Sequence, residues 1–71
     1  MFEQGDIVKV IDVESIKKDE LIDNEALEIM QKSNFTGDVT KVEGDIYFVG
    51  FSNELGWVTK GFKSDEIERV N

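Results

Sequence analysis

Strand signals near both ends of this chain restrict its possible folds more than any other feature. Residues 5–10 read GDIVKV, and residues 64–70 read SDEIERV. The β-branched residues of the first segment alternate with a charged one, which indicates a strand that begins directly after a Gly-Asp turn. The second segment reads as a turn that leads into a short apolar strand. We therefore predict a small β domain in which both ends of the chain join one sheet.

The first strand is predicted over residues 7–13. Val8 and Val10 lie on either side of Lys9 and predict one inward face, but apolar residues also occupy the opposite parity. Two explanations remain open: the strand is covered on both faces, or a β-bulge after Val10 switches the parity. We favour the bulge, because bulges are common in strongly bent strands.

A helical insertion follows this strand. Residues 14–23 are charged and poor in strand-forming types, and Asp23 or Asn24 can cap a helix that runs to about Lys32. Because no glycine or proline interrupts the preceding residues, the helix could begin as early as residue 19, so the insertion is placed at about residues 19–33. Phe35 is expected to anchor the return of the chain into the sheet.

The second half of the chain predicts a β-hairpin. A strand over residues 37–42, a tight turn at 43–45 and a strand over 46–51 follow one another, with glycine at the turn. Within the second strand the bulkier alternate set is expected to face inward, which leaves Phe48 partly exposed. The inward set comprises Tyr47, Val49 and Phe51.

The remaining residues complete a mainly β fold. Residues 52–56 predict a turn, 57–59 a fourth strand, 64–66 a helical turn and 67–70 the last strand. Five short strands in a meander, with one helix between strands 1 and 2, fit a small, partly open SH3-like barrel. We expect residues 1–71 to form one such domain.

Several of these motifs carry a resemblance to a known family. Residues 5–8 (GDIV), 42–45 (VEGD), 56–58 (GWV) and 65–68 (DEIE) span essentially the whole length of the chain. With them the sequence resembles the YorP family, small proteins of phage and prophage origin. The resemblance implies an SH3-like five-stranded barrel with a helix between its strands. It implies no activity, because the family supplies no catalytic or binding residues to carry over.

Residue usage argues against an enzyme. Without cysteine or histidine the chain lacks thiolate nucleophiles, the usual zinc ligands and the commonest general base. The carboxylates lie among polar residues, where ionised side chains are expected, and no phosphate-binding glycine motif occurs. Asp19, Glu20 and Asp23 lack the central glycine of a calcium loop. We therefore predict no enzymatic activity, no cofactor and no metal site.

Net charge bears on the kind of partner. Sixteen acidic residues against eight basic ones give −8, which disfavours binding to a phosphate backbone. The same charge suits a basic patch on another protein. The alternative is a nucleic-acid-associated module that uses a local basic strip despite the overall charge. Its candidate residues are Lys41, Lys60, Lys63 and Arg69.

Aromatic residues supply the candidate protein-binding surface. SH3-like barrels offer an aromatic patch between loops and an exposed strand edge for β-augmentation. Phe48, Trp57 and Phe62 are the candidates for the patch, although each could instead close the core. Trp57, which follows Gly56, is the one most expected to be exposed.

These observations give one functional expectation. No stretch approaches the roughly 18 apolar residues of a membrane span, and no leader precedes the first strand. We expect a soluble, non-enzymatic phage or prophage accessory protein that binds a host or phage protein in the bacterial cytoplasm. The sequence does not indicate its oligomeric state.

Overall fold

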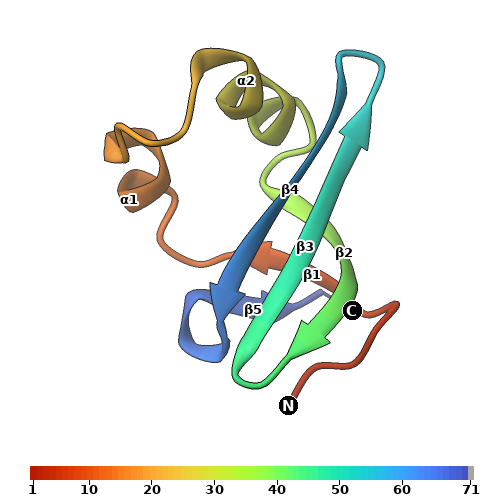
Figure 1. Cartoon of the computed structure of the whole chain (residues 1–71). Helices are drawn as coiled ribbons and strands as arrows, with labels where there is room; N and C mark the ends of the chain where they lie inside the picture. Colours follow the sequence, from red (N-terminus) through yellow and green to blue (C-terminus); the bar gives the residue numbers. More distant parts are fainter. Residues whose placement is uncertain (71) are drawn as a thin grey trace.

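The computed structural model describes residues 1–70, which form one five-stranded antiparallel sheet with two helices after the first strand (Figure 1). The strand order is β4-β3-β2-β1-β5, so the sheet is not closed and β4 and β5 are its edges. In chain order the elements are β1 (Ile7–Val10), α1 (Val13–Lys18), α2 (Asn24–Lys32), β2 (Thr36–Glu43), β3 (Ile46–Asn53), β4 (Gly56–Lys63), the 3-10 helix η1 (Ser64–Glu66) and β5 (Ile67–Arg69).

The first strand is shorter than predicted, and the expected bulge after Val10 is wrong. β1 ends at Val10 because Asp12 begins a helix: its Oδ1 accepts a hydrogen bond from the Ser15 N–H at 3.2 Å. The Ser15 hydroxyl donates in return to the Asp12 carbonyl at 2.8 Å. This reciprocal cap starts α1, a six-residue helix that the sequence did not predict, and α1 buries Ile16 in the core.

Aspartates also set the boundary between the two helices. Asp19 has extended backbone angles, and its Oδ1 accepts from the Leu21 N–H at 2.9 Å, which turns the chain away from helix. Asp23 Oδ1 then accepts from the Ala26 N–H at 2.8 Å and caps α2. The prediction of a helix over Asn24–Lys32 is confirmed, and the earlier start at residue 19 is wrong.

Phe35 returns the chain to the sheet, as predicted. Asn34 and Phe35 have φ angles of +56° and +54°, and the Phe35 N–H donates to the Met30 carbonyl at 2.8 Å. This left-handed pair reverses the chain directly after α2. The turn carries the Phe35 side chain into the core.

The predicted hairpin is confirmed. β2 and β3 pair from Glu43 opposite Ile46, with Gly44 at a φ of +58° in the turn. Tyr47, Val49 and Phe51 all face the core, as expected. These three residues define the inner face of the sheet, and the residues between them define its outer face.

A bulge does occur in the sheet, but in β2. The register with β3 shifts between Val39 and Lys41, so Thr40 is the additional residue, and its hydroxyl donates to the Phe48 carbonyl at 3.3 Å. Gly37 lies close to this irregularity. A β-carbon on Gly37 would come 2.3 Å from the Gly50 carbonyl oxygen, so only glycine fits this crossing of β2 and β3.

The closing segment follows the prediction, with a longer fourth strand. β4 extends through Lys63 instead of ending near Thr59, the helical turn is η1, and β5 pairs with β1 through Val10 opposite Ile67. Strands from both ends of the chain therefore lie side by side, as their sequence signals indicated.

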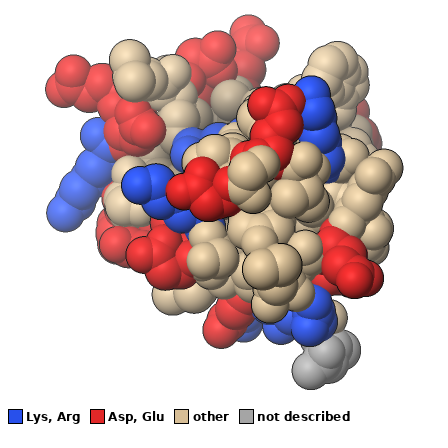
Figure 2. Space-filling model, turned by 60° about the horizontal axis from the view of Figure 1, so that its bottom comes forward, with Lys and Arg blue, Asp and Glu red and all other residues tan. Residues whose placement is uncertain are grey.

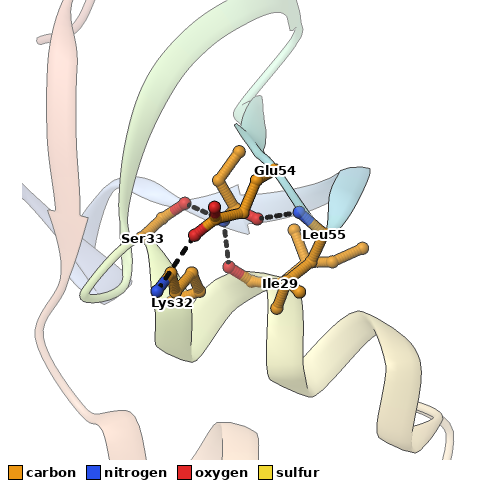
Figure 3. Close-up of polar contacts among 6 residues, drawn as sticks. Ile29, Lys32, Ser33, Glu54 and Leu55 are labelled. Atoms are coloured by element: carbon orange, nitrogen blue, oxygen red, sulfur yellow. Dashed lines mark hydrogen bonds and ion pairs between the residues drawn. The ribbon is translucent and has the colours of Figure 1, made fainter.

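Helix α2 covers the inner face near the β3–β4 hairpin (Figure 1). The amide nitrogen of Asn53 donates to the Ile29 carbonyl at 2.9 Å and to the Ser33 hydroxyl at 2.7 Å, joining the hairpin to the end of α2 (Figure 3). Within residues 1–70 the buried residues are hydrophobic: Val8, Val10, Ile16, Ile29, Met30, Phe35, Val39, Tyr47, Val49, Phe51, Phe62 and Ile67.

Candidate functional site

The edge strand β4 presents unpaired backbone. Among the described residues β4 pairs with β3 only, and in an antiparallel pair every second residue directs its N–H and C=O away from the partner strand. The Lys63 N–H donates to Glu66 Oε1 at 2.8 Å, so Lys63 belongs to the outward set. The alternation then places the backbone groups of Trp57, Thr59 and Gly61 on the free edge.

Between Trp57 and Gly61, a side chain covers this edge only at Gly61. The Lys60 ammonium donates to the Gly61 carbonyl at 3.3 Å and lies 4.4 Å from the centroid of the Phe62 ring. No turn, loop or side-chain hydrogen bond within residues 1–70 reaches the backbone of Trp57 or Thr59. We call the segment from Trp57 to Thr59 the open edge.

A groove of about 450 Å³ lies beside the open edge, between β4 and the start of α2. Ala26 and Met30 of α2 line one side, and Val58 of β4 lines the other. Leu21, in the loop between the helices, also lines the groove and is 95% exposed. The groove therefore combines apolar walls with an unpaired strand edge.

Both acidic and basic side chains line this groove. Asp19 and Asp23 contribute carboxylates, each of which accepts one backbone hydrogen bond as described above. Lys60 is the basic residue that lines the groove. Its ammonium already contacts the Gly61 carbonyl and the Phe62 ring. Because the lysine is engaged, the two carboxylates dominate the electrostatics of the groove and favour a cationic ligand.

Trp57 flanks the open edge on the outer face. Its side chain is 77% exposed, and it lies opposite Ser52, whereas the neighbouring Val58 lies opposite the buried Phe51. The expectation that Trp57 is exposed is confirmed. An exposed indole beside unpaired backbone gives this edge a large amphipathic contact surface.

The three aromatic candidates do not form one patch. Phe62 is only 1% exposed and packs edge to face against Phe51, so it is a core residue and presents no surface to a partner. Phe48 is half-buried, as predicted, and lies opposite Gly61. It shares the outer face with Trp57 but stands four register positions away along β3. Trp57 is the candidate that remains at the edge.

The four basic candidates do not form a continuous strip. Lys41 and Lys63 lie on the outer face, whereas Lys60 lies opposite the buried Val49 on the inner face. Arg69 is in β5, at the other edge of the sheet. Lys41 also pairs with Glu43, and Arg69 with Asp6. On the face drawn in Figure 2, basic groups are separate and lie next to acidic ones.

Two features are absent from the described part of the chain. Residues 1–70 contain no group of three or more aspartates or glutamates placed to hold a metal ion, and no helix in them has the length and apolarity of a membrane span.

A second hollow of about 290 Å³ lies between α1 and η1. Beside it the Ile11 N–H donates to the Glu66 carbonyl at 3.0 Å.

Sequence reasoning named the exposed edge in general terms but missed the groove. Its walls combine residues from α2 and β4, and only the packing of the helix on the sheet brings these together. Lys60 was the available signal, because an inward-facing lysine is typical of a protected edge strand.

Comparison of the chain with known protein families, with curated proteins and with solved structures finds no match.

Proposed function

We propose that this chain is a non-enzymatic accessory protein that binds another protein through the open edge of β4. The observation that carries the proposal is the 77% exposure of Trp57 next to backbone that no described residue pairs. Long unpaired edges are normally shortened, covered or charged, because they associate with other chains. Tryptophan at such a position supplies the kind of anchor that dominates protein interfaces.

We assign the fold to the SH3-like barrels. A four-strand meander followed by a 3-10 turn and a last strand beside the first is the arrangement that these barrels use, and the open sheet order supports it. The resemblance to the YorP family points to the same fold and to a phage or prophage origin. The partner would then be a host or phage protein in the bacterial cytoplasm.

Charge supports a protein partner with a basic surface. The chain carries −8, and Lys41, Arg69 and Lys9 are each paired with a carboxylate. Binding to such a partner would be accelerated by electrostatic attraction and weakened by salt. Nucleic-acid binding has less support, because the four candidate basic residues lie on different faces and edges.

The test compares three forms of the protein as bait in a bacterial host lysate. Wild type and Val42→Ala should retain the same partner, and Trp57→Ala should lose it, since Val42 is an exposed apolar residue of β2, outside the groove and the open edge. Recovery should fall as salt rises. Far-UV circular dichroism establishes that each variant is folded. Equal recovery by wild type and Trp57→Ala would exclude the open edge as the binding surface.

A further inference from the structure

Building on the proposed function, we propose that the open edge binds an extended segment of its partner as an added β-strand. Alternate side chains of that strand enter the groove between β4 and α2, and a basic side chain lies next to Asp19 and Asp23. The ligand class is therefore an extended peptide in which apolar residues alternate and at least one lysine or arginine is present.

The backbone of β4 supplies the first part of the case. Trp57 and Thr59 both direct N–H and C=O outward, and residues two apart in a strand are spaced by about 7 Å, which matches the repeat of an added strand. β4 is eight residues long, which is long for an edge. Lys60 protects the edge only at the Gly61 carbonyl, so the protection stops before Thr59.

The groove supplies the second part. In an added strand every second side chain would lie on the inner side of the sheet, alongside Val58 and facing α2. There it would contact Ala26 and Met30, and methionine adapts readily to different apolar groups. The volume of about 450 Å³ lies in the range of about 300–1,000 Å³ that ligand pockets occupy.

Charge decides between a peptide of another protein and a second copy of this chain. Asp19 and Asp23 line the groove. The basic residue there, Lys60, already donates to the Gly61 carbonyl of its own strand. Pairing two copies through β4 would bring together chains of −8 each, which repel. A basic, apolar-alternating segment complements both the carboxylates and the overall charge.

The probe is a pool of acetylated and amidated eight-residue peptides with valine or leucine at alternate positions and lysine, glutamate or serine elsewhere. Binding to ¹⁵N-labelled protein is followed by NMR. Lysine-containing members should slow hydrogen exchange at the amides of Trp57 and Thr59 by at least about tenfold. The matched glutamate peptides should bind at least about tenfold more weakly.

Two changes test the backbone pairing directly. Thr59→Pro removes an outward N–H and leaves the pairing with β3 intact, whereas Thr59→Val keeps that N–H. We expect affinity for the best lysine peptide to fall at least about tenfold with proline and to change less than about threefold with valine. If Thr59→Pro does not fold, N-methylation of alternate peptide amides makes the same test on the wild-type protein.

Three results would overturn strand addition: no peptide of the pool binds, binding survives both Thr59→Pro and peptide N-methylation, or the edge is occupied by a second copy. Sedimentation identifies the last case as a concentration-dependent dimer that Thr59→Pro removes. If Thr59→Pro retains the lysate partner while Trp57→Ala loses it, partner binding stands and strand addition fails. If neither variant affects partner recovery, the proposed function itself fails.

Discussion

Arg69 and Asp6 join the two terminal segments of the chain: the Arg69 guanidinium donates to Asp6 Oδ2 at 2.8 Å. The same nitrogen donates to the Met1 carbonyl at 3.0 Å, and the guanidinium lies 5.6 Å from the Phe2 ring. Phe2 in turn packs edge to face on the buried Tyr47. One ion pair thus fixes the residue before β1, the end of β5 and the segment that covers Tyr47.

Asp6 should make the stability of the protein depend on pH in the acid range. The hydrogen bond from the Glu3 backbone and the guanidinium of Arg69 hold the pKa of the Asp6 carboxyl below its ordinary value. A lowered folded-state pKa stabilises the protein above the unfolded-state pKa of about 3.9, and this contribution is lost as pH falls through the folded value.

The variant Asp6→Asn measures this contribution by urea denaturation across about pH 7 to pH 2. Its free energy of unfolding should be lower than that of wild type at neutral pH, and the difference should shrink as pH falls below about 4. Glu20→Gln is the control, because Glu20 is exposed and its carboxylate makes no hydrogen bond or ion pair within residues 1–70. A constant difference across the range would contradict the assignment.

Gly37 should be among the least replaceable residues. Gly37→Ala places a β-carbon against the Gly50 carbonyl and should lower the free energy of unfolding by at least about 2 kcal/mol. Gly44→Ala is the matched control: its β-carbon meets nothing within 4 Å, so only the positive φ is penalised, by about 1 kcal/mol. Equal losses for the two variants would show that β2 and β3 are not in close contact at Gly37.

Asn53 should contribute to stability through the joint between the hairpin and α2. Asn53→Ala removes the hydrogen bonds to Ile29 and Ser33 and the one that Leu55 donates to its side-chain oxygen at 2.9 Å (Figure 3). We expect a loss of about 1–3 kcal/mol in the free energy of unfolding. Chemical denaturation measures it.

Glu54→Gln provides the comparison for Asn53. It weakens only the exposed ion pair with Lys32, 3.0 Å long, and should cost less than about 1 kcal/mol. If both variants proved equally stable, the half-buried amide of Asn53 would not be the element that joins α2 to the hairpin.

Lys60 should keep the edge strand from pairing with other copies. Lys60→Val removes the ammonium that covers the Gly61 carbonyl and lengthens the apolar inner side of β4, so self-association should increase. Sedimentation velocity over a range of concentrations measures the effect. Lys63→Val is the control for the lost charge, because Lys63 is exposed on the outer face. Identical association of both variants would point to net charge instead of edge protection.

The strands were predictable because their signals are local. Alternation at Val8 and Val10, the Gly44 turn and the inward set of β3 each follow from side-chain period or turn chemistry. The end of β1 at Val10 was not predictable, because it depends on whether Asp12 caps a helix or continues the strand. The local sequence is compatible with either structure. The reciprocal bonds with Ser15 decide for the helix.

The candidate site was only partly predictable for a related reason. Exposure of Trp57 follows from its position after the turn, but burial of Phe62 depends on strand β4 extending four residues beyond its predicted end at residue 59. That extension places Phe62 opposite Tyr47 on the inner face. The groove required the distance between α2 and β4, which no local pattern contains.

Native-state hydrogen exchange of the free protein tests the central claim most directly, because it reads each amide of β4 separately. The amides of Val58 and Lys60, which face β3, should exchange slowly, and those of Trp57 and Thr59 should exchange far faster. This alternation along one strand is the result that an open edge predicts. Equally slow exchange at all four amides would show that the edge is covered and would contradict the proposed binding surface.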